Sequence, residues 1–377
     1  MTAAALAVRP IDADTHAAYL RSLPAASFLQ TPAWGQVKSE WRAESLGWFA
    51  GDRLAGAGLV LHRAVPRIGR TLAYLPEGPV LDWADAARSG SLASWLDPMV
   101  AYLRAAKAFA IRMGPPVAVR RWDAATVKAA VADSSVRRLG DVPADVSELT
   151  GHAVIGQLRA AGWRQQSADG GFAAGQPQYV FQVPLADRDD AALLAGMNQL
   201  WRRNIKRAAK EGVQIRTGRR DDLARFHSLY VETAARDGFT PRPLGYFEGM
   251  WDALTAEDSD RIRLYLAEHA GDLVAATTLV RVGEHAWYSY GASSTAKREV
   301  RGSNAVQWQM IRDARSAGAT VYDLRGITDT LDADDPHIGL VQFKVGTGGQ
   351  AVELAGEWDL PLNRALYSAF DLYLRRR

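Results

Sequence analysis

Short apolar runs, a polar turn and a helical pattern follow one another in the same order at two places in this chain. Residues 50–56 read AGDRLAG and residues 270–276 read AGDLVAA, and each heptad lies between apolar runs short enough to be strands. A Gly-Asp pair between two such runs is typical of a hairpin turn. Each copy is therefore predicted to be a strand, a Gly-Asp turn and a second strand.

A helical pattern and a further strand follow each predicted hairpin. Apolar positions recur with helical spacing over residues 92–105 and 304–317, and compact apolar runs come next at 109–113 and 321–324. The pattern predicts an α/β protein with two tandem domains of one mixed type. Two like domains packed together create a cleft, where ligands tend to bind.

The composition is that of a soluble globular protein. Hydrophobic residues make up 48% of the chain and charged residues 23%, which suits two or three domains with full cores. The chain has no cysteine, which excludes thiol catalysis, disulfides and thiolate metal sites. Residues 1–10 lack the pattern of a secretory leader, and no apolar run approaches a membrane span, so a cytoplasmic location is expected.

A local basic patch stands out against a small net charge of +3, from 45 basic and 42 acidic residues. Residues 192–211 have helical periodicity and are predicted to form one helix with a buried stripe. The stripe consists of Leu193, Met197, Leu200, Trp201, Ile205 and Ala208. Another face carries Arg203, Lys206, Arg207 and Lys210. This face is either a solvated surface whose cations suit the end of a helix or a binding face for phosphates.

Two segments near the start of the chain each carry one charged candidate residue, Lys38 next to a predicted helix and Asp82 after a predicted turn. Thr31 followed by Pro32 predicts a helix start and puts Lys38 next to an apolar stripe, where most lysines are surface residues. Tyr74 precedes a Pro/Gly turn that ends at Asp82. Asp82 is either a helix cap or a carboxylate that holds or deprotonates an amine.

A Gly-rich stretch near the end of the chain follows Phe343 and Lys344. It lacks the Gly-Lys-Ser/Thr order of a phosphate-binding loop and more simply forms a turn. The acidic loop before it, with Asp332, Asp334 and His337, lacks the spacing of a calcium loop. No metal site is therefore predicted.

Six stretches, taken in order, resemble the Fem (FemABX) family of peptidoglycan-bridge aminoacyltransferases. They are FLQTPAWG with Lys38, PEGPVLD ending at Asp82, RNIK at 203–206, YGAS at 290–293, YDLRG at 322–326, and GL with FK at 339–344. Together they cover nearly the whole chain. The resemblance implies two tandem GCN5-related N-acyltransferase-like domains with mixed sheets and a cleft between them. The first would be residues 1–188, completed by 350–377, and the second residues 189–349.

The resemblance also implies a reaction. An amino acid, glycine, alanine or serine, would pass from aminoacyl-tRNA to the side-chain amine of residue three in the stem peptide of UDP-MurNAc-pentapeptide or lipid II. Aminolysis of an activated ester needs no covalent nucleophile, and no cofactor is expected. The family expectation is a monomer, and a lipid-linked acceptor would allow peripheral contact with the inner membrane face.

The family's roles carry over to matching positions of this chain. The expected catalytic residues are Lys344, Phe343 and Asp82. The expected precursor-binding residues are Lys38, Tyr74, Arg203, Tyr290 and Glu357, and the expected tRNA-binding residues are Lys206, Arg207 and Lys210. Lys344 is the principal catalytic candidate, as a cation that stabilises the terminal phosphate of tRNA or the developing oxyanion.

Two other classes of function stay open. The first is an acyl-CoA-dependent N-acyltransferase on another amine, although residues 298–305 contain only part of the usual coenzyme A loop. The second is a non-catalytic protein that binds RNA or cell-wall precursor through the basic helix face. Ligand binding without turnover would distinguish this second class from both enzymes.

Overall fold

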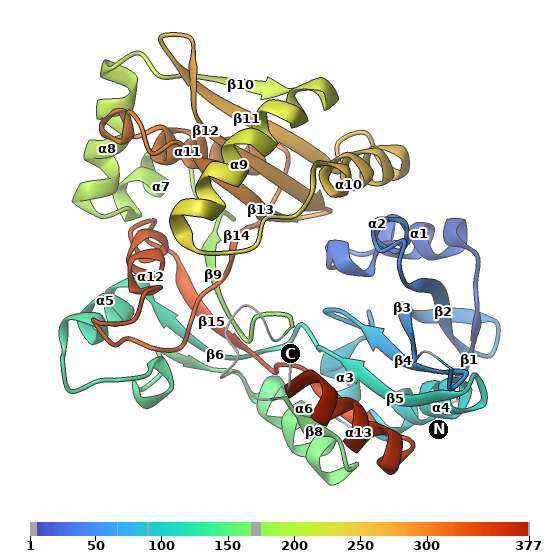
Figure 1. Cartoon of the computed structure of the whole chain (residues 1–377). Coiled ribbons are helices and arrows are strands. Elements are labelled where there is room, and N and C mark those ends of the chain that lie inside the picture. Colours follow the sequence, from blue (N-terminus) through green and yellow to red (C-terminus); the bar gives the residue numbers. More distant parts are fainter. Residues whose placement is uncertain (1–5, 66, 89, 167–174, 376–377) are drawn as a thin grey trace. The chain divides into compact units, whose positions relative to one another are not determined.

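The chain forms two compact units (Figure 1). The computed structural model describes residues 6–65, 67–88, 90–166 and 175–375. The first unit contains Met1–Arg121, Val146–Gln178 and Val352–Arg377, and the second contains Trp122–Asp145 and Tyr179–Ala351. Residues 122–145 thus belong with the second half of the chain.

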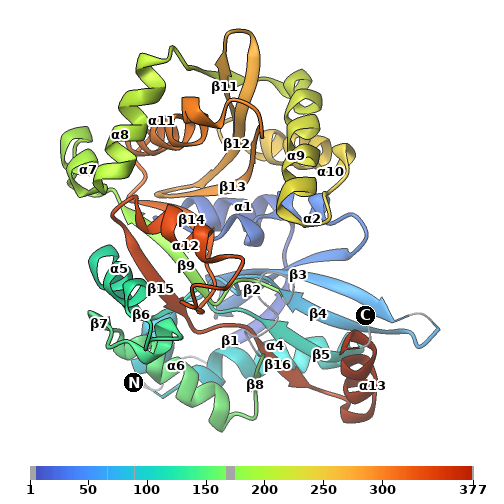
Figure 2. The ribbon, with the colours of Figure 1, turned by 60° about the vertical axis from the view of Figure 1, so that its left-hand side comes forward.

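One mixed sheet organises the first unit, in the strand order β1-β2-β3-β4-β5-β16-β8. The strands are β1 (Leu6–Pro10), β2 (Arg42–Ala50), β3 (Arg53–Val65), β4 (Arg70–Leu75), β5 (Ala108–Met113), β16 (Trp358–Pro361) and β8 (Arg164–Gln165). The helices are α1 (Ala13–Arg21), α2 (Pro32–Val37), α3 (Trp83–Arg88), α4 (Leu92–Ala105), α6 (Leu149–Ala160) and α13 (Arg364–Arg375), and α13 lies alongside β5 (Figure 2). Because β4 and β5 are parallel, the chain needs a crossover between them, which α3 and α4 supply.

The second unit repeats this plan. Its strands follow the order β10-β11-β12-β13-β14-β9, with β13 and β14 parallel and joined by a helical crossover, α11. The strands are β10 (Gln214–Gly218), β11 (Ile262–His269), β12 (Asp272–Val282), β13 (His285–Ser293), β14 (Val321–Gly326) and β9 (Tyr179–Pro184). The helices are α5 (Ala124–Ala132), α7 (Asp190–Gly196), α8 (Gln199–Lys210), α9 (Leu223–Asp237), α10 (Leu244–Glu257), α11 (Gly302–Ser316) and α12 (Ile338–Val345). The predicted α/β fold with two mixed sheets is confirmed.

Three short strands complete the element list. The chain runs from one unit into the other along β6 (Ala118–Asp123) and β15 (Gln350–Leu354). In the first unit, β7 (Val146–Ser147) pairs with β6. None of the helices in the described part of the chain is long and apolar enough to cross a membrane.

The two predicted hairpins have turns of different composition. In the first, Gly51 and Asp52 form the two-residue turn, as predicted. In the second, the turn residues are Ala270 and Gly271, and Asp272 already belongs to β12, so the predicted Gly-Asp turn is wrong by one position. Ala270 and Gly271 have φ angles of 49° and 85°. A two-residue turn with both φ angles positive favours glycine at its second position, which shifts the turn by one residue.

Helices on both faces explain the apolar run in β11. Leu264 and Leu266 pack against α9 and α10, whereas Tyr265 and Ala267 belong to the core under α8 and α11. Successive side chains of a strand point to opposite faces, so a strand covered on both sides is apolar at every position. The second sheet is thus packed on both faces by helices, including α8, which carries candidate residues.

The prediction of a single helix over residues 192–211 is wrong. The structure has two helices, α7 and α8, separated at Met197 and Asn198. The Asn198 side chain accepts a hydrogen bond from Trp201 N at 2.9 Å and caps a new helix. Leu200, predicted in the buried stripe, is 50% exposed, while Trp201 is buried.

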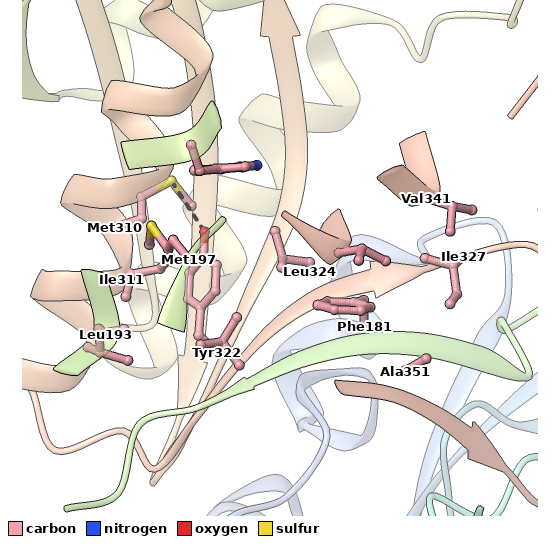
Figure 3. Packing of buried hydrophobic residues seen from close by; sticks show 14 of the residues in the cluster. Phe181, Leu193, Met197, Met310, Ile311, Tyr322, Leu324, Ile327, Val341 and Ala351 are labelled. Carbon is pink, nitrogen blue, oxygen red and sulfur yellow. Dashed lines mark hydrogen bonds between the residues drawn. The ribbon is translucent and has the colours of Figure 1, made fainter. Parts of the chain in front are cut away.

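The end of β14 and α12 share one hydrophobic cluster. Val341 of α12 lies toward Ile327, which follows β14, and Phe181 and Leu324 line the same cluster (Figure 3). All four side chains are buried. The packing fixes α12 against the end of β14, where the lysine predicted to be catalytic is placed.

Candidate active site

The two parallel strands of the second unit part after three paired residues. His285, Ala286 and Trp287 of β13 pair with β14, and the rest of both strands diverges. In the first unit, by contrast, the parallel pair of β4 and β5 continues to the last residue of both strands. The parallel pair therefore separates in the second unit, whereas it stays paired to its end in the first.

Lys344 is buried at this opening, with 3% of its surface exposed. Its Nζ donates to the carbonyl oxygens of Gly326, at 2.5 Å, and Arg325, at 3.4 Å. Arg325 has a left-handed backbone with φ of 63°, which turns these carbonyls away from a regular strand. The lysine thus satisfies carbonyl groups where the sheet ends.

Burial lowers the pKa of Lys344 to about 7, because an ammonium group loses its hydration in the core. The nearby Arg325 charge also lowers this pKa, and the carboxylate of Asp323 opposes both effects. The ammonium and the neutral amine therefore coexist near neutral pH. Such a group can supply positive charge and can also exchange a proton.

Asp323 is held as an anion beside this lysine. Burial alone would raise its pKa, but the hydrogen bond and charge of His285, the Arg325 charge and a bond from Gln182 keep it below its ordinary value. Gln182 Nε2 donates to Asp323 Oδ2 at 2.9 Å, and His285 Nε2 lies 3.4 Å from the same oxygen. The carboxylate is therefore fixed in position.

Phe343 connects α12 to the basic helix. Its ring lies 4.8 Å from the ring of Trp201, and Trp201 Nε1 donates to its carbonyl oxygen at 2.8 Å. The next turn of α8 is held by Asn204, which donates to Asn304 of α11 at 3.3 Å. The predicted cationic face, Arg203, Lys206, Arg207 and Lys210, is exposed to solvent.

Tyr290 belongs to an aromatic cluster in the second unit. Its hydroxyl oxygen lies 3.1 Å from that of Tyr246, and the rings of Tyr230 and Phe247 pack edge-on against it. Arg242 lies over the Tyr246 ring at 4.6 Å. Burial alone would lower the pKa of Arg242, but Tyr290 and Tyr246 raise it above its ordinary value. Tyr290 thus lies in a group of packed aromatic rings, and the Arg242 cation lies over one of them.

Tyr74 and Glu357 come together in the first unit. The Tyr74 hydroxyl donates to Glu357 Oε1 at 2.6 Å, and Gln176 Nε2 donates to the Tyr74 oxygen at 3.3 Å. Burial raises the pKa of Glu357 to about 7, although the bond from Tyr74 and the charge of Arg112 act in the opposite direction. This carboxyl group is therefore also poised to change its charge near neutral pH.

Arg112 forms an ion pair with Asp359, two residues after Glu357. Two of its nitrogens donate to the two carboxylate oxygens of Asp359, both at 2.7 Å, and Tyr367 of α13 donates to Asp359 Oδ2 at 2.7 Å. Asp359 is fully buried. This ion pair anchors α13 and supports the strand that leads from Glu357.

The remaining candidates of the first unit lie at helix ends. Lys38 follows α2, whose start is capped by Thr31 as predicted, and its Nζ lies 5.3 Å from the Trp34 ring. Asp82 is exposed, and its Oδ1 accepts a hydrogen bond from Asp85 N at 2.9 Å. The contact fits the helix-cap interpretation of Asp82, while its chemical role stays a prediction.

Sequence reasoning did not identify several residues that shape these sites. His285 contacts Asp323 across 38 residues, Tyr246 contacts Tyr290 across 44, and Arg112 contacts Asp359 across 247. No local pattern marks such pairs, because each partner lies in a different element.

The two units share one mixed fold, and the second combines a separated parallel strand pair with a buried lysine. The FemAB family model matches residues 11–270 and 261–374, so the chain belongs to the FemAB family.

Similar proteins span nearly the same length. The lipid II:glycine glycyltransferase of Staphylococcus saprophyticus is 24% identical over 95% of this chain and 94% of its own. The protein of that name from Staphylococcus aureus is 25% identical over 94% and 93%. The crystal structure of FemX has a TM-score of 0.79 at 24% identity and covers 96% of this chain. The structure of L-PGS from Bacillus licheniformis has a TM-score of 0.53 at 10% identity, over 97% of both chains.

Lys344 should make stability depend on pH. Between pH 7 and 10 the unfolded chain still binds a proton that the folded lysine has lost, because the folded pKa is about 7 and the ordinary value is 10.5. The free energy of unfolding should therefore rise with pH, by about 1.4 kcal/mol per pH unit from this group. Urea unfolding of the wild type and Lys344→Met across this range measures the contribution, which the variant should lack.

Lys128→Met is the matched control, because Lys128 lies exposed on α5 of the same unit. Its pH profile should follow that of the wild type. Parallel profiles for the wild type and Lys344→Met would show that Lys344 does not titrate in this range.

Proposed function

We propose that this protein transfers an amino acid from aminoacyl-tRNA to the side-chain amine of residue three in the stem peptide of a peptidoglycan precursor. The observation that carries the proposal is the buried Lys344 at the parting of β13 and β14. Membership of the FemAB family supports it, as do the two relatives whose names give lipid II as acceptor and glycine as donor group. Glycine is therefore the first amino acid to test.

The reaction requires an amine to displace an alcohol from an ester. The neutral amine nitrogen attacks the ester carbonyl carbon, the bond from carbon to the ribose oxygen of tRNA breaks, and the amine loses a proton while the ribose oxygen gains one. Positive charge near the carbonyl oxygen lowers the barrier most. With its pKa near 7, Lys344 can stabilise the oxyanion or donate the proton that the leaving oxygen requires.

The other residues position Lys344 or bind the substrates in this proposal. Phe343 keeps α12 and Lys344 in register with α8 through its contact with Trp201. Lys38 and Arg203 bind the phosphates of the precursor, since both are cations at accessible helix positions. Asp82 receives or orients the acceptor amine.

Tyr74, Glu357 and Tyr290 bind the polar part of the precursor in this proposal. The carboxyl of Glu357 already accepts a short hydrogen bond from Tyr74, so we expect the two side chains to bind the precursor together. The Tyr290 hydroxyl has a second tyrosine, Tyr246, as its partner. Hydroxyl groups fixed in this way lose little entropy when a ligand binds.

Purified protein should transfer labelled glycine from charged tRNA to UDP-MurNAc-pentapeptide or to lipid II. A mixture of charged tRNAs, with both acceptors assayed in parallel, identifies the amino acid and the preferred acceptor. If neither acceptor is labelled although the tRNAs are verified as charged, the proposal is wrong. Protection against thermal unfolding by coenzyme A but not by UDP-MurNAc-pentapeptide would then favour an acyl-CoA transferase.

Lys344 and the phosphate-binding cations should differ in their kinetic effects. Lys344→Ala should lower kcat by about 100-fold or more with little change in KM for the precursor, because its charge acts on the transition state. Lys38→Ala and Arg203→Ala should mainly raise that KM. Steady-state kinetics decides, with Lys128→Ala as the control lysine. Equal effects on kcat and KM in all three variants would contradict this division of roles.

The exposed cations of α8 should make activity sensitive to salt. Lys206, Arg207 and Lys210 face solvent on this helix, and contacts with tRNA phosphates release counterions. Replacing all three with Gln should reduce the slope of log(kcat/KM) for tRNA against log salt by about 2 to 3. An unchanged slope would show that this face is only a solvated helix surface.

A further inference from the structure

One end of the first sheet gathers cations from separate segments of the chain. β3 ends where β4 begins, with Val65 paired to Arg70. β5 starts at the same end, because Thr71 pairs with Ala108 and Thr71 N donates to Lys107 O at 3.4 Å. β16 is antiparallel to β5 and ends there as well. The cations brought to this end are Arg67, Arg70, Arg104, Lys107 and Arg364, which we call the basic end.

The basic end is exposed to solvent. Arg67, Arg104, Lys107 and Arg364 are exposed, and Arg70 is partly exposed. Among the residues that the structure describes, none of the five cations forms an ion pair. The whole chain has a net charge of only +3. Five cations without ion-pair partners at one end of the sheet therefore create a local positive field. The small net charge of the whole chain does not reveal this field.

Aliphatic side chains accompany these cations. Ile68, at the tip of the β3–β4 hairpin, is 46% exposed between Arg67 and Arg70. Figure 2 shows this hairpin beside α13, and Val65 packs with Phe370 of that helix against one cluster. The same helix presents Leu372, which is 50% exposed.

A nucleic acid and an anionic lipid surface are the two polyanions that could neutralise this surface. The apolar side chains beside the cations distinguish between them. Single-stranded nucleic acids stack their bases on aromatic rings. Among the side chains that the structure describes at this end, the exposed apolar ones are aliphatic, Ile68 and Leu372. Apolar side chains surrounded by arginines fit the boundary between headgroups and acyl chains, where the cations meet lipid phosphates. The chemistry therefore favours a lipid surface over RNA.

We propose that the basic end docks this protein on the surface of a membrane that contains anionic phospholipids. Contact is peripheral, through the β3–β4 hairpin and the helix beside it. Its purpose rests on the proposed function, since docking would hold the enzyme where a lipid-linked acceptor is embedded. The docking itself requires no catalysis, so it can be tested separately.

Co-sedimentation with lipid vesicles tests the docking directly. The wild type should bind vesicles that contain phosphatidylglycerol and should not bind vesicles of phosphatidylcholine alone. Each cation near an anionic surface contributes roughly a five-fold gain in partitioning. A variant with Arg67→Gln, Arg70→Gln and Lys107→Gln should therefore bind about 100-fold more weakly. Ile68→Ser should weaken binding further.

The matched control replaces three exposed cations of α8, Lys206, Arg207 and Lys210, with Gln. It removes the same charge from the protein, so it should leave vesicle binding unchanged if the basic end is the docking surface. Equal vesicle binding by the wild type and the basic-end variant would overturn the proposal. Loss of tRNA binding in the basic-end variant, with vesicle binding intact, would instead identify an RNA surface.

Transfer assays connect the docking to catalysis. The basic-end variant should label soluble UDP-MurNAc-pentapeptide at the wild-type rate and should lose activity only toward lipid II embedded in anionic vesicles. Equal losses with both acceptors would contradict a docking role. If the wild type labels neither acceptor, the proposed function fails, and the vesicle measurement still decides whether the basic end binds membranes.

Discussion

The parting of two parallel strands in the second unit is the constraint on which its candidate site depends. When β13 and β14 diverge, backbone groups that a sheet would pair need other partners, and an unsatisfied buried group costs about 1 to 3 kcal/mol. Lys344 satisfies the carbonyl oxygens of Gly326 and Arg325 at this place. The lysine is thus part of the architecture, and the same burial brings its pKa into the range useful for proton transfer.

Duplication of a fold has not produced duplicate sites. In the first unit, β4 and β5 remain paired to the last residue of both strands, so these two strands do not separate. That unit instead places its distinctive group, the carboxyl of Glu357, next to Tyr74. Burial perturbs both Glu357 and Lys344 toward a pKa of about 7, but it stabilises the neutral form of an acid in one unit and of a base in the other.

Much of the fold could be predicted because its signals are local. The hairpin and crossover pattern repeats in the sequence, and Thr31 with Pro32 correctly marks the start of α2. Errors arose where a periodic pattern competed with a local cap. The apolar stripe around Leu200 suggested one continuous helix, but the hydrogen bond of Asn198 to the next turn divides it. The second turn shifted by one residue because its backbone has two successive positive φ angles.

The sequence by itself determined which residue types are present and which local elements they form, including the exposed cationic face of α8. Only the tertiary structure decided which groups are buried and which meet. Tyr74 and Glu357 are 283 residues apart, and Lys344 owes its lowered pKa to a core assembled from distant strands and helices. Desolvation and long-range contacts depend on which distant segments the fold brings together. A periodic pattern along the sequence does not contain that information.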